Sequence, residues 1–361
     1  MNRRAEKNVS TPAAKDGLEA AQAEMLANRL RKRFRHLKKW ARRTGTDVFR
    51  LYDRDIPEIP LVLDWYGDAA AGALYKRPYE KDEAEERRWI SAMAEAVAKA
   101  LDIDPCRVFI KFRERQRGSS QYRRLGDRGV IREVSEGGLR FRVNLSDYLD
   151  TGLFPDRRRL RALIREGAAG KRVLNLFCYT ASFSVYAAAG GAAEVDSVDL
   201  SNTYLDWGLE NFRLNGFTGE QVSEGALPGN PRRPAGGDQS APLPRFRFIR
   251  ADVLAFLAAA AQARRRWDMI ILDPPAFSNS KKMSAALDIQ RDHPGLIRSA
   301  LRLLAPGGAL WFSANARRFR LHPEEVQTAE FPGLRIEDMK DLLTDEDFRG
   351  KKIPVCYLFH L

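Results

Sequence analysis

The stretch from Lys171 to Ser201 constrains the fold of this chain more than any other. It opens with a mainly apolar run, residues 173–177, that has the length of a buried strand. Small and hydroxyl-bearing residues follow, and then a helix-like segment, 183–189, that ends at two glycines. A second apolar run, 195–198, leads into Asp199. This order of strand, turn, helix, strand and acid predicts half of a doubly wound, Rossmann-like α/β sheet that binds a nucleotide-like ligand.

The turn of this unit lacks the G-x-G-x-x-G pattern of dinucleotide-binding folds. Those glycines bring the backbone close to a pyrophosphate. S-adenosylmethionine has no phosphate, so a looser turn suits it, and Asp199 would then hold the ribose hydroxyls. The alternative is an ordinary strand-helix-strand unit whose acid merely ends a strand. This stretch alone does not decide between the two.

Two further strands end in acids. Residues 245–250 precede Ala251-Asp252, and residues 267–272 precede the turn Asp-Pro-Pro-Ala-Phe. Because the carboxyl ends of parallel strands meet at one edge of a sheet, we expect a single cluster there. Its members are Asn175, Asp199, Asp252 and Asp273. One acid would hold the ribose, one the adenine amino group, and the Asp-Pro-Pro turn would frame the methyl group.

The chain is strongly basic near its N-terminus. Lys and Arg number 61 against 48 Asp and Glu, a net charge of +13 that favours a polyanionic partner. A helix is predicted over residues 18–43, and its part from Arg29 to Arg43 carries nine basic residues and no acid. We expect phosphate contacts from one face, with an anionic membrane or a merely solvated face as alternatives. The expected contacts are Arg31, Arg35, Lys38 and Arg42.

A second basic stretch, residues 113–124, follows a predicted strand at 108–112. Its glycine and serines suggest a loop that follows a nucleic-acid backbone, and Tyr122 offers a ring for base stacking. A solvent-exposed hairpin is an equally good interpretation. The expected nucleic-acid contacts here are Arg113, Arg115, Gln116 and Tyr122.

Several sequence blocks resemble the large-subunit ribosomal RNA methyltransferases. They are residues 175–185 (NLFCYTASFSV), 190–192 (GGA), 198–201 (VDLS), 251–252, 273–281 (DPPAFSNSK), 27–42, 113–118, 145–154 and 288–293. The similarity covers about residues 25–360. It is strongest to the K half of the bifunctional 23S rRNA guanine-N7 enzymes, which forms 7-methylguanosine. Ala181 stands where that family usually has a turn glycine, and Ala314 replaces an asparagine.

The resemblance implies a class I methyltransferase sheet, S-adenosylmethionine as cofactor, and 23S ribosomal RNA or a large-subunit precursor as partner. It implies that the catalytic residues are Asp273, Pro274, Pro275 and Phe277. It implies cofactor contacts from Phe154, Arg158, Asn175, Phe177, Tyr179, Thr180, Asp199, Leu200, Asp252 and Asp273. It adds Lys281 to the RNA contacts.

Reaction chemistry favours guanine N7 as the methyl acceptor. Methylation of C5 in a pyrimidine needs a thiolate that adds to C6, and no cysteine follows the fourth or fifth predicted strand. Guanine N7 has a lone pair and no proton to lose, so the site must only align the atoms. Asp273 could act electrostatically on the charge that develops. A 5-methylcytosine methyltransferase and a non-catalytic RNA-binding assembly factor on the same fold stay open as alternatives.

We expect four parts in the chain: a disordered tail (1–24), a basic helix with a small α+β RNA-binding domain (25–150), a class I methyltransferase domain (151–361), and within it a disordered Gly- and Pro-rich insert (219–244). Three scattered cysteines predict neither a metal site nor a disulfide framework. The sequence shows neither a signal peptide nor a membrane-spanning apolar run, so we expect a cytoplasmic protein.

Overall fold

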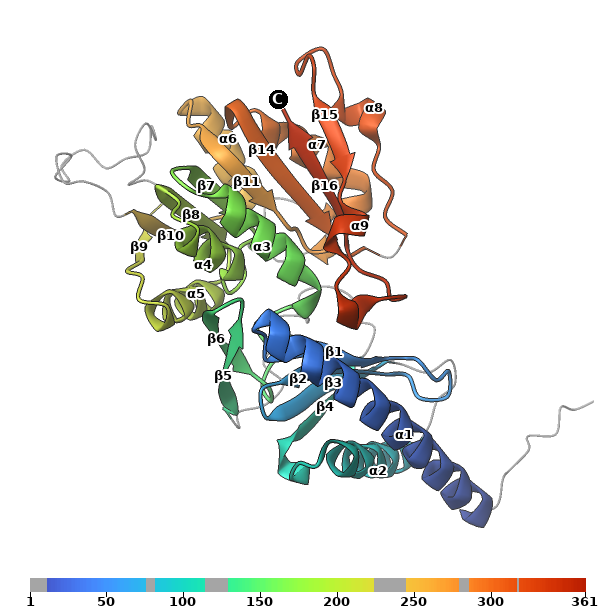
Figure 1. Cartoon of the computed structure of the whole chain (residues 1–361). Coiled ribbons are helices and arrows are strands. Elements are labelled where there is room, and N and C mark those ends of the chain that lie inside the picture. Colours follow the sequence, from blue (N-terminus) through green and yellow to red (C-terminus); the bar gives the residue numbers. More distant parts are fainter. Residues whose placement is uncertain (1–11, 76–81, 114–128, 224–244, 279–285, 317) are drawn as a thin grey trace, which may run out of the picture. The chain divides into compact units, whose positions relative to one another are not determined.

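The computed structural model describes residues 12–75, 82–113, 129–223, 245–278, 286–316 and 318–361 (Figure 1). The chain divides into two compact units, Met1–Arg115 and Gln116–Leu361, and each has its own sheet. We expected the boundary at 150/151. The division between the two compact units lies at 115/116, before the hairpin of residues 131–144.

The first unit is a four-stranded sheet with two long helices. In the order of the sheet the strands are β1 (Val48–Asp53), β2 (Leu61–Tyr66), β3 (Ala69–Tyr75) and β4 (Val108–Arg113). The first three are antiparallel, and β4 runs parallel to β3 after the crossover through α2 (Glu83–Leu101) and the short η1 (Pro105–Arg107). This arrangement confirms the small α+β fold that the sequence predicted.

The helix α1 (Pro12–Thr44) begins earlier than expected. Residues up to 24 were assigned to a disordered tail, but the segment from Pro12 is rich in alanine, the best helix former. Proline is well tolerated in a first helical turn. The Gln22 side chain also accepts a hydrogen bond from Trp89 Nε1 of α2 (2.6 Å), which holds the added turns in the fold. Leu26 and Leu30 then continue the apolar stripe into the core.

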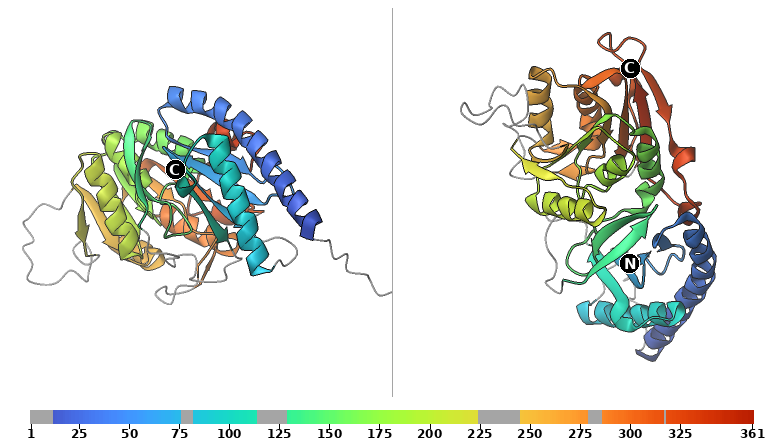
Figure 2. Two further views of the ribbon diagram at one scale, coloured as in Figure 1. Left: turned by 90° about the horizontal axis from the view of Figure 1, so that it is seen from below. Right: turned by 60° about the vertical axis from the view of Figure 1, so that its left-hand side comes forward.

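The second unit contains an eight-stranded sheet in the order β15-β16-β14-β11-β7-β8-β10-β9 (Figures 1 and 2). The strands are β7 (Arg172–Leu176), β8 (Glu194–Asp199), β9 (Glu220–Val222), β10 (Phe246–Arg250), β11 (Trp267–Leu272), β14 (Leu304–Ala314), β15 (Arg335–Asp338) and β16 (Val355–His360). All pairings from β9 to β14 are parallel, whereas β16 is antiparallel to both β14 and β15. The predicted doubly wound methyltransferase sheet is confirmed, together with its antiparallel closing strand.

Helices cover both faces of this sheet (Figures 1 and 2). On one face lie α3 (Arg158–Gly167), α4 (Ser182–Ala189) and α5 (Asn202–Leu214). On the other lie α6 (Val253–Gln262) and α7 (Ile289–Leu301), whose apolar side chains form one core with alternate strand residues such as Leu174 and Leu176. Strand residues of the opposite parity, such as Asn175, therefore face α4.

Shorter elements complete the second unit. They are η3 (Pro155–Arg157), the two-stranded ribbon β12 (Phe277–Ser278) and β13 (Leu287–Asp288), α8 (Pro323–Val326), α9 (Lys340–Leu343) and η5 (Glu346–Phe348). The predicted insert 219–244 is ordered at its start, because β9 pairs with β10 through backbone hydrogen bonds that need no particular side chains. The remainder of that insert, 224–244, lies outside the described residues.

The hairpin of β5 (Ile131–Glu136) and β6 (Leu139–Asn144) belongs to the second unit. Along its length β6 packs on α5 (Figure 1). The Asn211 side chain accepts the backbone N–H of Arg142 (2.9 Å), and Trp207 Nε1 donates to the Arg142 carbonyl (2.8 Å). These long-range bonds tie the hairpin to α5, and they cannot be read from the local sequence pattern. Within the described ranges, no helix is both long and apolar enough to cross a membrane.

Candidate active site

The strand registers bring the predicted acids to one edge of the large sheet. Leu176 is level with Val198 and Leu272, so β7, β8 and β11 end together. Asp199 ends β8, and Asp273 directly follows β11. Asp252 lies two residues beyond β10, whose last residue is level with Asp199. The three acids therefore meet at the carboxyl edge, where ligands of doubly wound sheets bind.

Asn175 lies inside β7 rather than at the edge. Its Nδ2 donates to Ser184 Oγ (2.9 Å), which in turn shares a hydrogen bond with Ser197 Oγ (2.7 Å). Its Oδ1 is buried and has no hydrogen-bond partner among the described residues. The predicted cofactor contact of Asn175 stays a prediction, and its visible role is to join β7 to α4 and β8.

Asp199 is the acid best suited to a ribose diol. One carboxylate oxygen accepts the Tyr179 N–H (3.0 Å), and the other accepts the Ser201 N–H (2.9 Å). Burial raises the pKa of Asp199 to about 6, although these backbone N–H groups act to lower it. A desolvated carboxylate is stabilised by further O–H donors, and each oxygen retains a lone pair. Two vicinal hydroxyls supply such donors, so this site fits the ribose of S-adenosylmethionine.

The turn after β7 contains three non-glycine residues in the left-handed region. They are Phe177 (φ 55°), Tyr179 (φ 51°) and Ala181 (φ 57°). Each costs about 1–2 kcal/mol relative to a right-handed conformation. This left-handed backbone conformation directs the Tyr179 N–H toward Asp199. It also explains why a glycine suits position 181, since glycine adopts this conformation without strain. Concentrated strain of this kind is typical of ligand-binding turns.

Aromatic rings surround Tyr179. Its ring lies 4.5 Å from that of Tyr204, 5.4 Å from Phe154 and 6.4 Å from Trp207, measured between centroids. Phe154 is 40% exposed, so part of its face is available to a ligand. These rings form an apolar wall next to Asp199, as a site for the adenosyl group requires.

A hydrogen bond fixes the loop that carries Phe154 to the turn. Thr180 Oγ1 donates to the Gly152 carbonyl (2.6 Å), so the hydroxyl is used within the protein. Gly152 has φ 105°, and a Cβ there would lie only 2.3 Å from the Trp207 ring. Thr180 therefore acts in the structure as a link, and its predicted cofactor contact is not tested by this geometry.

Asp273 is held by Arg157, a residue that the sequence interpretation did not select. Arg157 Nε lies 3.0 Å from Oδ2 and Nη2 lies 2.8 Å from Oδ1 of Asp273. Arg157 is only 7% exposed. Burial lowers its pKa, but Asp273 and Asp156 outweigh this effect and raise it, so the guanidinium stays charged. Three arginines, 157–159, are adjacent in the sequence, and only the helical phase decides which one faces β11.

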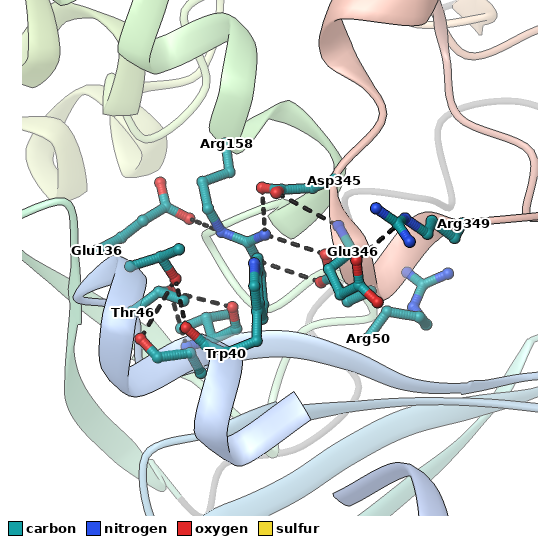
Figure 3. Close-up of polar contacts among 12 residues, drawn as sticks. Trp40, Thr46, Arg50, Glu136, Arg158, Asp345, Glu346 and Arg349 are labelled. Atoms are coloured by element: carbon teal, nitrogen blue, oxygen red, sulfur yellow. Dashed lines mark hydrogen bonds and ion pairs between the residues drawn. The ribbon is translucent and has the colours of Figure 1, made fainter. Parts of the chain in front are cut away.

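The neighbouring Arg158 is directed into a different set of carboxylates. Its Nη1 lies 2.9 Å from Asp345 and 3.1 Å from Asp347, and its Nε lies 3.4 Å from Glu136 (Figure 3). Arg161 also forms a two-point pair with Glu136. These buried contacts join α3 to β5 and η5. The predicted cofactor contact of Arg158 stays a prediction, and in the structure its guanidinium pairs with these carboxylates.

The rest of the predicted site lies around the Asp-Pro-Pro turn. Pro274 is buried and Pro275 half-buried, whereas Phe277 on β12 is 45% exposed. Asp252 caps α6 by accepting the Leu254 N–H (2.9 Å). The half-buried Leu200 follows Asp199. Lys281 lies outside the described residues.

The two buried cysteines do not have the properties of nucleophiles. Burial raises the pKa of both Cys178 and Cys356 above that of a free thiol. Cys356, however, is not remote from the site, as the sequence pattern suggested. It is level with Ser313 across β14 and β16, and the charges of Arg157 and Asp273 act on its thiol. The antiparallel closing strand brings it there, and sequence distance gives no sign of this.

The basic face of α1 is smaller than the sequence suggests. Arg29 pairs with Asp55 (2.7 Å), and Arg33 Nε donates to the Leu51 carbonyl (2.7 Å), so these two support the fold. Seven basic residues of the stretch remain exposed, among them the four predicted phosphate contacts Arg31, Arg35, Lys38 and Arg42. Arg113 ends β4, and the predicted contacts Arg115, Gln116 and Tyr122 lie outside the described residues.

Comparison with known proteins agrees with this geometry. The sequence profile of the S-adenosylmethionine-dependent methyltransferases matches residues 48–226. Ribosomal RNA large subunit methyltransferase K of Neisseria meningitidis serogroup B is 45% identical over 331 residues, which cover 92% of this chain and 85% of that protein. The chain belongs to this methyltransferase family. The predicted resemblance and the predicted cofactor, S-adenosylmethionine, are thereby confirmed.

Longer relatives share the same region. Ribosomal RNA large subunit methyltransferase K/L of Pseudomonas putida is 45% identical over 327 residues, and this chain spans only 40% of its length. Among solved structures, SMU.776, a candidate methyltransferase complexed with S-adenosylhomocysteine, aligns with a TM-score of 0.68 at 22% identity, over 94% of this chain and 82% of that one. At this identity the likeness supports the methyltransferase fold.

Proposed function

We propose that the chain transfers a methyl group from S-adenosylmethionine to N7 of a guanine in 23S ribosomal RNA, or in a large-subunit precursor, in the cytoplasm. The observation that carries the proposal is the 45% identity to a ribosomal RNA large subunit methyltransferase K, because it extends over 85% of that relative. The choice of N7 rests on the chemistry of the residues at the sheet edge.

Attack by N7 removes no proton. Its lone pair attacks the methyl carbon, the carbon–sulfur bond breaks, S-adenosylhomocysteine leaves, and the guanine becomes positively charged. Such a reaction needs alignment of nitrogen, carbon and sulfur, and no general base. Asp273 is already paired with Arg157 at two points, which suits a carboxylate that positions the Asp-Pro-Pro turn and takes up no proton.

The 5-methylcytosine alternative needs a thiolate near the base. Cys178 and Cys356 are buried with raised pKa values, and neither follows the end of β11 or β14. The non-catalytic alternative needs no cofactor site, whereas Asp199 and its aromatic surroundings fit one. The state of the thiols favours guanine N7 over 5-methylcytosine, and the fit of the cofactor site favours an enzyme over a non-catalytic factor.

For the RNA we assign phosphate contacts to the exposed face of α1, through Arg31, Arg35, Lys38 and Arg42. The segment 113–124 and Lys281 are proposed to contact RNA closer to the reacting guanine. Charge on α1 would position the RNA without reading its sequence.

The decisive experiment compares modified nucleosides in 23S ribosomal RNA from cells with and without this gene, by mass spectrometry. Loss of one 7-methylguanosine, restored by the purified protein with S-adenosylmethionine in vitro, is the expected result. Loss of 5-methylcytosine would establish the competing chemistry. An unchanged nucleoside profile, with RNA bound by the purified protein, would identify a non-catalytic factor.

A further inference from the structure

A groove of about 510 Å³ lies between the β5–β6 hairpin and the last turns of α5, entirely within the second unit. The hairpin contributes Arg132, Glu133, Arg140 and Arg142 to its lining, and α5 contributes Glu210 and Arg213. This place is distinct from the edge that carries Asp199, because α5 starts at the carboxyl edge and runs away from it.

The lining carries an excess of positive charge. Four guanidinium groups face two carboxylates, so the groove itself has a net charge of +2. Arg140 pairs with Glu133 (3.0 Å) and Arg142 with Glu210 (2.6 Å). Arg213 is exposed and forms no ion pair with any described residue. Arg213 thus offers the groove a positive charge that Glu133 and Glu210 do not balance.

The backbone beneath these side chains is fixed. The Asn215 side chain accepts the Arg140 N–H (2.9 Å) and donates to the Arg140 carbonyl (2.8 Å). Asn211 and Trp207 hold Arg142 in the same two-sided way. The guanidinium groups therefore extend from a rigid platform, which lowers the entropy lost when a ligand is bound.

We propose that this groove binds the phosphodiester backbone of the RNA substrate at a point away from the reacting guanine. Guanidinium groups bind phosphates through paired hydrogen bonds. The interspersed Glu133 and Glu210 would repel a compact polyphosphate, whereas an extended strand can place successive phosphates on the arginines. Ile131, 37% exposed, adds an apolar surface for a sugar. The class of ligand rests on the proposed function.

The groove would complement α1 because the two belong to different units. Contacts on α1 hold RNA to the first unit. A phosphate bound at the groove is fixed relative to the sheet edge that carries Asp199 and Asp273, since hairpin, α5 and sheet form one unit. Phosphate contacts set register and orientation. The groove should therefore affect how often bound RNA places its guanine at this sheet edge. The effect should be largest at low RNA concentration.

The test is the double variant Arg132→Gln/Arg213→Gln in the full chain. Its matched control is Arg335→Gln/Lys340→Gln, which removes the same charge from exposed residues at β15 and α9, the opposite edge of the sheet. A transcribed 23S ribosomal RNA fragment serves as probe. Its affinity is measured over a salt series, together with kcat, the KM for RNA and the Kd for S-adenosylmethionine.

We expect the groove variant to raise the KM for RNA roughly tenfold and to reduce the slope of log affinity against log salt by about 2, one for each lost phosphate contact. Its kcat and cofactor Kd should stay at the wild-type values, and the control should change the slope far less. Equal behaviour of both double variants, or an RNA affinity unaltered in the groove variant, overturns the proposal. The single variant Arg213→Gln, at an exposed helix position, repeats the test if the double variant folds poorly.

Failure of the proposed function has a different signature. If the wild-type chain binds the fragment but transfers no methyl group, the reaction assignment is wrong, while the binding comparison between the two double variants still decides the role of the groove. If an acidic peptide such as polyglutamate competes with RNA at the groove more strongly than a second RNA does, the groove takes a protein partner and the RNA proposal is wrong.

Discussion

Arg157 and Asp273 join the segment before α3 to the end of β11 through two parallel hydrogen bonds of 3.0 and 2.8 Å. The pair fixes both oxygens of the carboxylate, and with them the start of the Asp-Pro-Pro turn. Its geometry depends on the flat, two-pronged guanidinium, which a lysine cannot reproduce.

Arg157→Lys should therefore lower kcat while the cofactor Kd stays unchanged. Loss of one charged hydrogen bond in a buried pair is expected to cost roughly 1–3 kcal/mol, or about 10- to 100-fold in rate. Arg159→Lys, at the exposed position two residues on, is the matched control. Initial-rate methyl-transfer assays at saturating RNA and cofactor measure kcat for both variants. Equal kcat values for the two variants would show that the pair has no influence on the reaction.

Asp199 should make cofactor binding depend on pH. Its pKa of about 6 in the cofactor-free protein exceeds the value of 3.8 expected for the unfolded chain. The folded state therefore binds the proton more readily, and the contribution of Asp199 to stability is lost as pH rises from about 4 to 6, by roughly 3 kcal/mol at most. The ribose hydroxyls need the ionised form, so cofactor affinity should fall as pH drops below 6.

Calorimetry with S-adenosylmethionine at several pH values from about 5 to about 8 checks this, because the series covers both sides of the pKa of about 6. Asp199→Ala should weaken binding by about 1–3 kcal/mol at neutral pH and flatten the pH dependence. Affinity that is the same in a folded Asp199→Ala protein would remove this residue from the site.

The cysteines should prove dispensable for methyl transfer. Burial keeps Cys178 and Cys356 as neutral thiols, and Cys106 lies in the first unit. A triple serine variant should retain kcat at saturating cofactor, with lower stability because two hydroxyl groups replace buried thiols. Thermal melting and nucleoside analysis measure the two effects separately. Lost transfer in a folded variant that still binds cofactor would restore the 5-methylcytosine alternative, with Cys356 as the first candidate because it lies near Asp273.

The large sheet could be predicted because each of its inner strands is a short apolar run that ends at an acid or a turn. Elements without such a pattern were missed: β9 within a Gly- and Pro-rich segment is held by backbone bonds alone. Long-range contacts also could not be predicted from the sequence. The hairpin β5–β6 joins the second unit through Asn211, and neither adjacency nor composition distinguishes Arg157 from Arg158. At the site, the acids could be predicted because each ends a predicted strand or closely follows one. The ring cluster around Tyr179 could not be predicted, because it depends on the folded turn.

The exposed face of α1 should control RNA affinity without affecting cofactor binding. Arg31, Arg35, Lys38 and Arg42 recur at three- and four-residue spacing, so they lie along one side of the helix, and all are exposed. Each phosphate contact releases counterions. Changing all four to glutamine should weaken binding to target and unrelated RNA alike and reduce the salt slope by about 3–4.

The control for this variant removes four exposed cations elsewhere in the first unit. They are Arg87, Arg88, Lys99 and Arg107. It has the same net charge as the α1 variant, so any general effect of charge on RNA attraction appears in both. Filter binding with the two RNAs over a salt series measures affinity and slope, and calorimetry shows whether the cofactor Kd stays constant. If the α1 variant and the control have the same slope, the helix face is only solvated, and RNA must be held by other parts of the protein.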